Sequence, residues 1–391
     1  MRVFVSEYVT TCDWPQSHEK VPLPAEQNQF ARSPHPAASL VHEGLSMLAA
    51  IVVDLARIPG VEIHATRSCL LDGFDLGTAC RIACERFAGG EMVFAQSKFE
   101  TGQLSDHIVW HSTSGSNSER EMIERLSAES GAALIIAPEF RGLLTERCRW
   151  VEQRNARLLG PSSAAVEICA DKFALCQRLQ LAGVSTIDTF EFDVEQPAAD
   201  LPFPVVIKPR DGAGSLVTYV LLHRVHLAWQ LPRLREESLL RNAVWQPFVA
   251  GRALSVGVLV SPETGRAAEA LPVCDQILSG DGRLKYFGGR VPADCSRAAE
   301  VQQIALAACE QVPGLRGYVG VDMLLPDDPR SPPLVVEINP RLTTSYLGYQ
   351  SLCLDNLAER ILFPDRDRPP LRWRDRQVTF APHGFAVPNM D

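Results

Sequence analysis

The chain has 391 residues, of which 46% are hydrophobic and 22% are charged, and its formal net charge is −9. This length exceeds one small core and predicts two or three domains. The acidic balance argues against a general nucleic-acid-binding protein and against binding to an anionic membrane surface. The longest apolar stretch, Met47 to Val53, is too short to span a bilayer, and the N-terminus lacks the pattern of a signal peptide.

The eleven cysteines are scattered along the chain, and no two of them form a CxxC pair. An odd number of scattered thiols is typical of reduced residues in a protein core, and not of a disulfide framework or a zinc site. The cysteine pattern therefore predicts a cytoplasmic protein.

The first 160 residues alternate between strand-like and helix-like segments. The predicted strands are Arg2–Tyr8, Val61–Thr66 and Ala132–Pro138, and the predicted helices are Ser39–Ile58 and a helix that a capping box at Ser118 and Glu121 opens and that runs to Glu129. This alternation predicts a small parallel α/β sheet. The proline-rich stretch from Cys12 to Pro36 has no periodicity and is expected to be disordered.

The pattern after Ser163 changes to α+β. One helix is predicted from Ser163 to Gly183, and further helices near His226–Glu237 and Ala298–Gln311. The predicted strands are 204–209, 217–222, 243–249, 253–260, 318–325 and 334–339. Several of these strands are expected to form antiparallel pairs.

The strand-like segment "VVEIN" carries polar residues where a buried strand would continue with valine or isoleucine. Because side chains alternate along a strand, Val335, Glu337 and Asn339 are expected to share one face. An antiparallel partner strand would place Asp322 opposite them on that face. Two carboxylates and an amide oxygen suit Mg²⁺. The alternative is an exposed sheet face with scattered polar residues, but close carboxylates repel one another without a cation between them.

The segment "VVIKPRDGAGS" places Lys208 at the end of a strand and a glycine-rich turn after it. Gly212 and Gly214 allow backbone amides to approach a phosphate, and Ser215 adds a hydroxyl donor. The segment matches neither the Walker pattern nor the dinucleotide fingerprint. Taken alone, it fits a hairpin turn with a surface lysine better than a phosphate site, and Lys172 near a helix start is also uninformative alone.

The order of these features resembles the ATP-grasp superfamily, and the resemblance covers roughly residues 161 to 362. Members hold ATP between two α+β subdomains and activate a carboxylate as an acyl phosphate. The resemblance implies an ATP-grasp fold, with α/β and α+β parts and an N-terminal parallel α/β (pre-ATP-grasp) domain. The implied division is residues 1–160 for this domain, 161–242 for a central subdomain with the lysines and the glycine loop, and 243–391 for a C-terminal subdomain with the hinge and the metal site.

The resemblance also implies roles for individual residues. Those implied to bind ATP are Lys172 and Lys208 at the phosphates, Gly212, Gly214 and Ser215 over them, and Gln246, Phe248 and Val249 in the adenine hinge, with the backbone of Val249 facing the ring. Those implied to hold Mg²⁺, or Mn²⁺ in its place, are Asp322, Glu337 and Asn339. The alanine at position 253 departs from the family, because many members carry a ribose-binding acidic residue there.

Two arginines are candidates for the chemistry at the carboxylate. Arg341, directly after the E-I-N-P segment, is a candidate to stabilise the oxyanion formed when an amine attacks an acyl phosphate. A salt bridge to a neighbouring loop is an equally good explanation of its position. Arg290 is a second candidate, for the intermediate or for the carboxylate of the substrate. No proton acceptor for the amine is identified, and Glu7 and Glu139 are candidates for holding the amine.

A narrower resemblance is to the tyramine–glutamate ligase group of ATP-grasp enzymes from methanofuran-type cofactor synthesis. This resemblance rests on the segments "SEYV", "APEF", "VVIKPRDGAGS", "QPFVAGRALSV" and "EINPRLTTSYLGY". The resemblance implies a ligase that joins glutamate to an aromatic amine as a γ-glutamyl amide and cleaves ATP to ADP and phosphate.

Other functions and features stay open. A dipeptide or polyglutamate ligase has the same fold, and a nucleotide-binding module without turnover would fit the alanine at position 253. The partners implied are small-molecule substrates, and a homodimer is an open alternative. His107 and His111 could be neighbours on a helical face, but no acidic third ligand lies nearby, so a surface or core role is expected for both.

Overall fold

The computed structural model describes residues 1–11, 36–68, 107–114, 116–212, 217–261 and 267–382. The stretch from Cys12 to His35 and the predicted phosphate-loop residues Gly214 and Ser215 lie outside the described residues.

The chain forms two compact units. The N-terminal unit comprises residues 1–137, 147–159 and 346–391, and the central unit comprises residues 138–146 and 160–345. The three-domain division made from the sequence stays a prediction.

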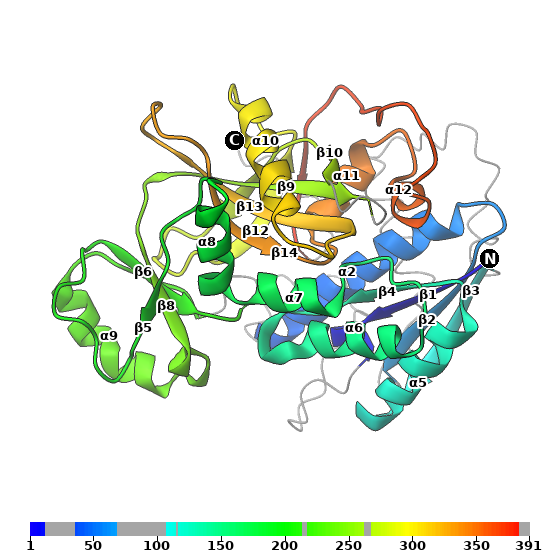
Figure 1. The fold of residues 1–391 in the computed structure, drawn as a ribbon, viewed down its shortest axis with the longest axis horizontal. Helices are drawn as coiled ribbons and strands as arrows, with labels where there is room; N and C mark the ends of the chain where they lie inside the picture. Colours follow the sequence, from blue (N-terminus) through cyan, green and yellow to red (C-terminus); the bar gives the residue numbers. More distant parts are fainter. Residues whose placement is uncertain (12–35, 69–106, 115, 213–216, 262–266, 383–391) are drawn as a thin grey trace, which may run out of the picture. The chain divides into compact units, whose positions relative to one another are not determined.

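The N-terminal unit contains the predicted parallel sheet (Figure 1). Its four strands are β1 (Arg2–Glu7), β2 (Glu62–Ser68), β3 (Ile108–Thr113) and β4 (Ala132–Ile136), in the order β3-β2-β1-β4. All three neighbouring pairs are parallel. The parallel α/β sheet is thus confirmed, but β3 was not predicted. His111 lies within β3, so the helical spacing of His107 and His111 is wrong.

Helices pack against this sheet, and α1 directly follows β1 along the chain. They are α1 (Tyr8–Thr11), α2 (Pro36–Ala56), α5 (Ser116–Glu129) and the part of α6 (Leu143–Gln153) from Arg147 onward. The first residues of α6 and the short 3-10 helix η4 (Phe140–Gly142) before it belong to the central unit. The predicted capping box is wrong, because α5 begins two residues before Ser118, whose hydroxyl accepts a hydrogen bond from the Ser114 amide at 2.8 Å. Glu7 ends β1 and accepts the amide of Thr10 at 2.8 Å, and burial raises the pKa of this carboxyl to about 7.

The C-terminal part of the chain belongs to the same unit and packs on α2. It contains α11 (Ser345–Leu352), α12 (Leu357–Leu362) and β15 (Val378–Phe380). The buried carboxylate of Asp54 in α2 accepts hydrogen bonds from the Tyr346 hydroxyl at 2.6 Å and the Gln350 amide at 2.8 Å. Asn356 donates to the Asp54 carbonyl at 2.7 Å. A buried carboxylate is costly unless donors satisfy it, so these bonds fix the C-terminal segment to α2.

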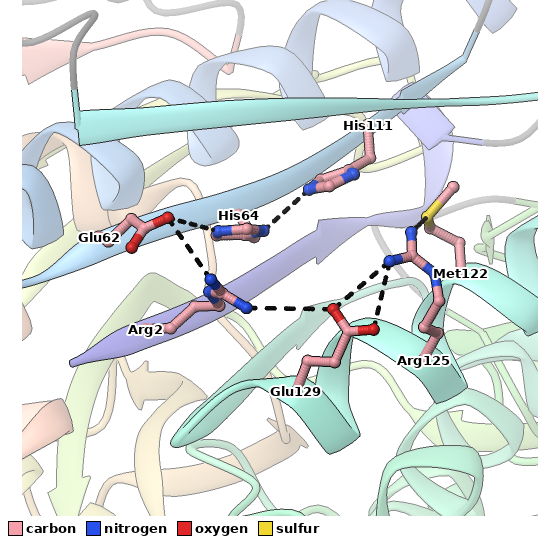
Figure 2. Close-up of polar contacts among 7 residues, drawn as sticks. All are labelled: Arg2, Glu62, His64, His111, Met122, Arg125 and Glu129. Carbon is pink, nitrogen blue, oxygen red and sulfur yellow. Dashed lines mark hydrogen bonds and ion pairs between the residues drawn. The ribbon is translucent and has the colours of Figure 1, made fainter.

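A chain of polar contacts joins residues of β1, β2, β3 and α5, with Arg2 of β1 between Glu62 and Glu129 (Figure 2). The ring of His64 lies between Glu62, at 2.8 Å from its Nε2, and His111, at 2.9 Å from its Nδ1. Since a carboxylate only accepts, Nε2 of His64 carries the proton, and in the neutral pair Nε2–H of His111 donates to Nδ1. A second proton on the pair would place two N–H groups against each other and break this bond.

The central unit has a small antiparallel sheet with helix α9 (Arg224–Glu236) beside it (Figure 1). Its strands are β5 (Phe190–Phe192), β6 (Val205–Pro209), β7 (Tyr219–Leu221) and β8 (Ala243–Pro247), in the order β5-β8-β6-β7. The 3-10 helix η5 (Ser238–Arg241) precedes β8. Val205 and Ile207 of β6 are buried in the core of this sheet. Lys208 therefore points to the opposite face, which it shares with Gln246.

The larger sheet of this unit is antiparallel and follows the order β14-β13-β9-β11-β12, with β10 also paired to β9. The strands are β9 (Gly251–Val260), β10 (Ala267–Ala270), β11 (Cys274–Leu278), β12 (Tyr286–Val291), β13 (Gly317–Pro326) and β14 (Leu334–Asn339). Helix α10 (Ala298–Glu310) packs its buried residues on the same core as Val256, Val319 and Val321. The sequence predicted β9, β13 and β14, but not β10, β11 or β12.

The helix predicted from Ser163 to Gly183 is two helices, α7 (Ser163–Ala170) and α8 (Lys172–Leu181). Asp171 separates them, with an extended backbone at φ −87° and ψ 95°. Its carboxylate accepts the amides of Phe173 and Ala174 at 3.1 and 3.0 Å, which makes it the N-cap of α8. The single-helix prediction is wrong because a capping aspartate starts a new helix. Lys172 becomes the first residue of α8.

No helix within the described segments is both long and apolar enough to cross a membrane.

The histidine pair predicts an acid-sensitive N-terminal unit. Burial, with His64 and Arg125 nearby, holds the pKa of His111 below its usual value. In the unfolded chain His111 takes up a proton near its ordinary pKa of about 6.5. For His111 the unfolded state thus binds more protons, so the contribution of this residue to the free energy of unfolding falls as the pH drops below that value. Glu7, whose pKa is raised, contributes in the opposite direction, so the effect of His111 is read as a difference between the wild type and a variant. Urea unfolding followed by circular dichroism between pH 7.5 and pH 5 measures the slope of the free energy of unfolding against pH.

His111→Gln should remove this contribution, so that the variant loses less stability than the wild type between pH 7.5 and pH 5, because a glutamine amide can still donate to His64 but does not titrate. The matched control is His223→Gln, which changes an exposed histidine and should leave the slope as it is in the wild type. An equal slope in the wild type and in His111→Gln would contradict this account.

Candidate active site

The strands β13 and β14 pair antiparallel, as predicted, and bring two carboxylates together. Asp322 lies directly opposite Glu337, and Gly320 lies opposite Asn339. The pairing then shifts by one residue, which leaves Val336 as the extra residue of a β-bulge. The bulge turns Val335 into the core, so the prediction that Val335 shares a face with Glu337 is wrong. The predicted shared face of Asp322, Glu337 and Asn339 is observed.

Two side-chain amides hold the carboxylate of Asp322. Asn339 donates to Oδ2 at 3.2 Å, and Gln276 of β11 donates to Oδ1 at 2.9 Å. Because the amide nitrogen of Asn339 is used in this way, its amide oxygen is free to act as a ligand. Gln276 was missed by the sequence analysis, because the strand that carries it was not predicted.

Two lysines from different elements approach the carboxylates. Lys172 at the start of α8 places Nζ 3.4 Å from Oε2 of Glu337 and donates to the Gly212 carbonyl at 2.7 Å. Lys208 at the end of β6 is buried, like Lys172, and both are only 7% exposed. Lysine is seldom buried unless it is paired, so these contacts indicate a charged cluster of functional interest. The charged cluster, as named from here on, is Lys172, Lys208, Asp322, Glu337 and Asn339.

The charges in the cluster shift one another's pKa values. Burial lowers the pKa of Lys208 to about 8, although Glu337 and Asp322 favour its charged form. Burial and the neighbouring Glu337 raise the pKa of Asp322 to about 8. Burial also disfavours the charged form of Glu337, but Lys172 and Lys208 outweigh it and hold the pKa of that carboxyl below its usual value. The lysines thus stabilise one carboxylate, and the second one lacks a full counter-charge.

A bidentate ion pair positions Lys172 and the start of the glycine loop. The guanidinium of Arg210 donates to both oxygens of Asp171, at 2.8 and 2.7 Å, and Asp171 also caps α8. The amide of Lys172 donates to the Arg210 carbonyl at 3.1 Å. A Cβ built on Gly212 would lie 3.4 Å from Pro209 and 3.7 Å from Nζ of Lys172, which are ordinary contact distances, so packing alone does not require glycine here. Neither Asp171 nor Arg210 was predicted as a site residue from the sequence.

The donor set of the cluster fits a hard divalent cation. Two carboxylates and one amide oxygen are oxygen ligands of the kind that Mg²⁺ or Mn²⁺ prefers. Asp322 and Glu337 lie within hydrogen-bonding reach of each other, so a cation between them would relieve their repulsion. The described residues contain no group of three or more His, Cys, Asp or Glu side chains arranged to hold a metal ion. Phosphate oxygens or waters would have to complete the coordination.

The predicted adenine hinge follows β8. Gln246 is buried, and its amide donates to the Thr189 hydroxyl at 2.8 Å, so its side chain supports the strand. The amide of Phe248 donates to the Pro204 carbonyl at 2.9 Å, and its side chain is 37% exposed. The backbone of Val249 is the next one along the chain. Its contact with a nucleotide stays a prediction.

The two predicted catalytic arginines have different surroundings. Arg341 forms an ion pair with Glu139, with 2.9 Å between Nε and Oε1, and its Nη1 donates to the Leu342 carbonyl at 3.2 Å. This is the salt bridge to a neighbouring loop that the sequence left open. Arg290 is exposed on β12 opposite Asp275, and therefore on the other face of the sheet from Gln276. A catalytic role for Arg290 stays a prediction.

Two family models match the chain. A pre ATP-grasp 3 domain matches residues 95–166, and an ATP-grasp domain matches residues 169–345. The second range contains every residue of the charged cluster.

Two curated relatives are tyramine–L-glutamate ligases. The one from Methanocaldococcus fervens is 29% identical over 56% of this chain and 61% of its own length. The one from Methanocaldococcus jannaschii is 27% identical over 64% of this chain and 67% of its own length. The chain therefore aligns with only about three fifths to two thirds of each relative.

The fold agrees with the family models. A crystal structure of an ATP-grasp superfamily protein from Archaeoglobus fulgidus superposes with a TM-score of 0.64 at 22% identity, covering 97% of this chain and 92% of that one. The two domain matches, their order along the chain and the fold together show that the chain belongs to the ATP-grasp superfamily, whose carboxylate–amine ligases it resembles.

Proposed function

We propose that this protein is an ADP-forming ligase that joins a carboxylate to an amine through an acyl phosphate. The acid substrate that we propose is L-glutamate, and the amine is tyramine or a close analogue. The observation that carries the proposal is the charged cluster, in which two lysines, two carboxylates and an amide oxygen converge in the central unit. The names of the two ligase relatives support the choice of substrates. Such a ligase would work in the cytoplasm, where ATP is available.

The lysines would bind the phosphates of ATP. Lys208 is buried and its charge is only partly compensated, so a polyanion brought next to it gains a strong interaction. Lys172 would change partner from Glu337 to a phosphate oxygen when a cation takes over that carboxylate. Gly214 and Ser215, which lie outside the described residues, are proposed to cover the phosphates.

Asp322, Glu337 and Asn339 would hold Mg²⁺ or Mn²⁺. When bound, the ion would neutralise charge on the outer phosphates and favour transfer of the γ-phosphoryl group. Gln276 and Asn339 already orient the carboxylate of Asp322 for this role. The cluster thus resembles a preorganised site for the metal complex of ATP, and the γ-phosphoryl group would pass to the carboxylate of the acid substrate.

Arg341 would then act on the acyl phosphate. Attack of an amine on the acyl carbon forms a bond to nitrogen and places negative charge on the carbonyl oxygen. A guanidinium near this oxygen stabilises the charge, and collapse of the intermediate releases phosphate and leaves the amide. Other acid–amine pairs, as in dipeptide or polyglutamate ligases, would use the same steps. A nucleotide-binding module would bind ATP without them.

Loss of one carboxylate of the cluster should abolish most turnover. We expect Asp322→Asn and Glu337→Gln to lower the rate of ATP cleavage in the presence of glutamate and tyramine by about 10²-fold or more. The reason is that charge on the outer phosphates would go unneutralised. Release of ADP is measured with a coupled assay, and the urea midpoint shows whether each variant is folded.

The matched control is Asp275→Asn, which removes a carboxylate from β11 of the same sheet, on the face opposite to that of Asp322. Asp275 binds Arg252 at 2.6 Å and makes no contact in the cluster, so turnover should stay near the wild-type value. Turnover in Glu337→Gln that equals that of the control would contradict the metal assignment.

An acyl phosphate intermediate predicts the products of the reaction. With ATP, Mg²⁺, glutamate and hydroxylamine, we expect glutamyl hydroxamate together with ADP and phosphate, because hydroxylamine traps an activated carboxylate. Chromatography of the nucleotides and a ferric chloride assay detect the products. AMP and pyrophosphate in place of ADP and phosphate would contradict the acyl phosphate mechanism. ATP binding without any cleavage would favour a nucleotide-binding module.

A further inference from the structure

Glu139 belongs to the central unit and lies in a short turn just before α6. Next to it, Arg141 adopts a left-handed backbone with φ 55°, and its amide donates to Asp211 at 3.0 Å. The amide of Leu144 donates to the Pro138 carbonyl at 3.2 Å. These contacts hold the turn against the loop that follows Lys208. The turn thereby presents the carboxylate of Glu139 to Arg341, beyond the end of β14.

The carboxylate of Glu139 is buried but poorly satisfied. Its side chain is 4% exposed, and its Oε1 lies 2.9 Å from Nε of Arg341. Neither oxygen accepts a well-aligned hydrogen bond from another residue in the described part of the chain. A buried polar group without such a bond costs free energy and calls for a functional explanation.

The surroundings of Glu139 connect it to the charged cluster. Burial raises the pKa of this carboxyl and outweighs Arg341, while Glu337 acts in the same direction as burial and Lys172 in the opposite one. Glu139 is therefore close enough to the cluster to sense two of its charges. A carboxylate with a raised pKa is also a stronger base than an exposed one.

A purely structural ion pair explains these observations less well. Buried ion pairs that stabilise a fold usually satisfy their charges with hydrogen bonds, as Arg147 and Glu119 do here with two bonds at 2.7 and 2.6 Å. The pair of Glu139 and Arg341 has a close contact without this alignment. The carboxylate oxygens of Glu139 therefore remain able to accept a proton or a hydrogen bond.

We propose that Glu139 is the proton acceptor for the attacking amine, and that Arg341 positions it beside the acyl carbon. This inference rests on the proposed ligase function. A carboxylate that shares a guanidinium with the developing oxyanion lies within a few ångströms of the carbon under attack. The amine nitrogen bonds to that carbon, so its protons are in reach of Glu139.

The step balances in atoms and charge. The lone pair of the amine forms the new C–N bond, and the carbonyl π pair moves to oxygen, where Arg341 faces it. The nitrogen, now positively charged, gives one proton to a carboxylate oxygen of Glu139. The oxyanion then reforms the carbonyl as the C–O bond to phosphate breaks. The carboxyl of Glu139 afterwards releases its proton to the departing phosphate or to solvent.

The test compares two nucleophiles in Glu139→Gln, which keeps the size of the side chain and removes the base. The nitrogen of tyramine is strongly basic, so the adduct keeps its extra proton until a base removes it, whereas the weakly basic nitrogen of hydroxylamine loses its proton to water. We expect kcat with tyramine to fall by about 10²-fold or more, and hydroxamate formation to stay near the wild-type rate. The limb of the pH profile that reports a base should also disappear for amide formation in the variant.

Three comparisons make the test decisive. Glu310→Gln, an exposed carboxylate at the end of α10, is the matched control and should leave both rates unchanged. Equal losses with both nucleophiles in Glu139→Gln would show a structural role and overturn the proposal, as would unchanged rates with both. A wild-type protein that forms no hydroxamate with any of the twenty amino acids would instead contradict the ligase function itself, and the role of Glu139 with it.

Discussion

The repulsion between two neighbouring carboxylates governs the arrangement of the central unit. Asp322 and Glu337 face each other across one strand pair, and burial makes their charges costly. Two lysines compensate part of that charge, and each comes from a different element, so α8 and β6 must be held at a fixed place relative to β13 and β14. The ion pair of Arg210 with Asp171 provides much of this positioning. In the proposed complex, phosphate and metal would complete the charge balance.

The features that were predicted correctly follow from patterns within short stretches of the sequence. Alternation along a strand placed Glu337 and Asn339 on one face, and a short turn-rich connection made an antiparallel partner for Asp322 the simplest arrangement. Alternating strands and helices likewise predicted the parallel sheet of the N-terminal unit. Both inferences needed only the period of a strand and the length of a connection.

The missed features depend on contacts that are distant in sequence or on a single residue. Gln276 reaches Asp322 only because β11 pairs with β9, and β11 is too short and too mixed to predict. Asp171 divides a helix whose apolar pattern continues on both sides, and one extra residue in β14 turned Val335 into the core. The pairing of Arg341 with Glu139 joins parts of the chain that no local pattern relates.

Binding of the metal complex of ATP by the charged cluster is the proposal on which the other functional assignments depend. It is tested by a crystal structure with Mn²⁺ and a non-hydrolysable ATP analogue, in which anomalous scattering locates the metal. We expect a Mn²⁺ peak about 2.1 Å from carboxylate oxygens of Asp322 and Glu337, with Lys172 and Lys208 on the phosphates. A nucleotide and metal bound away from these side chains would contradict it.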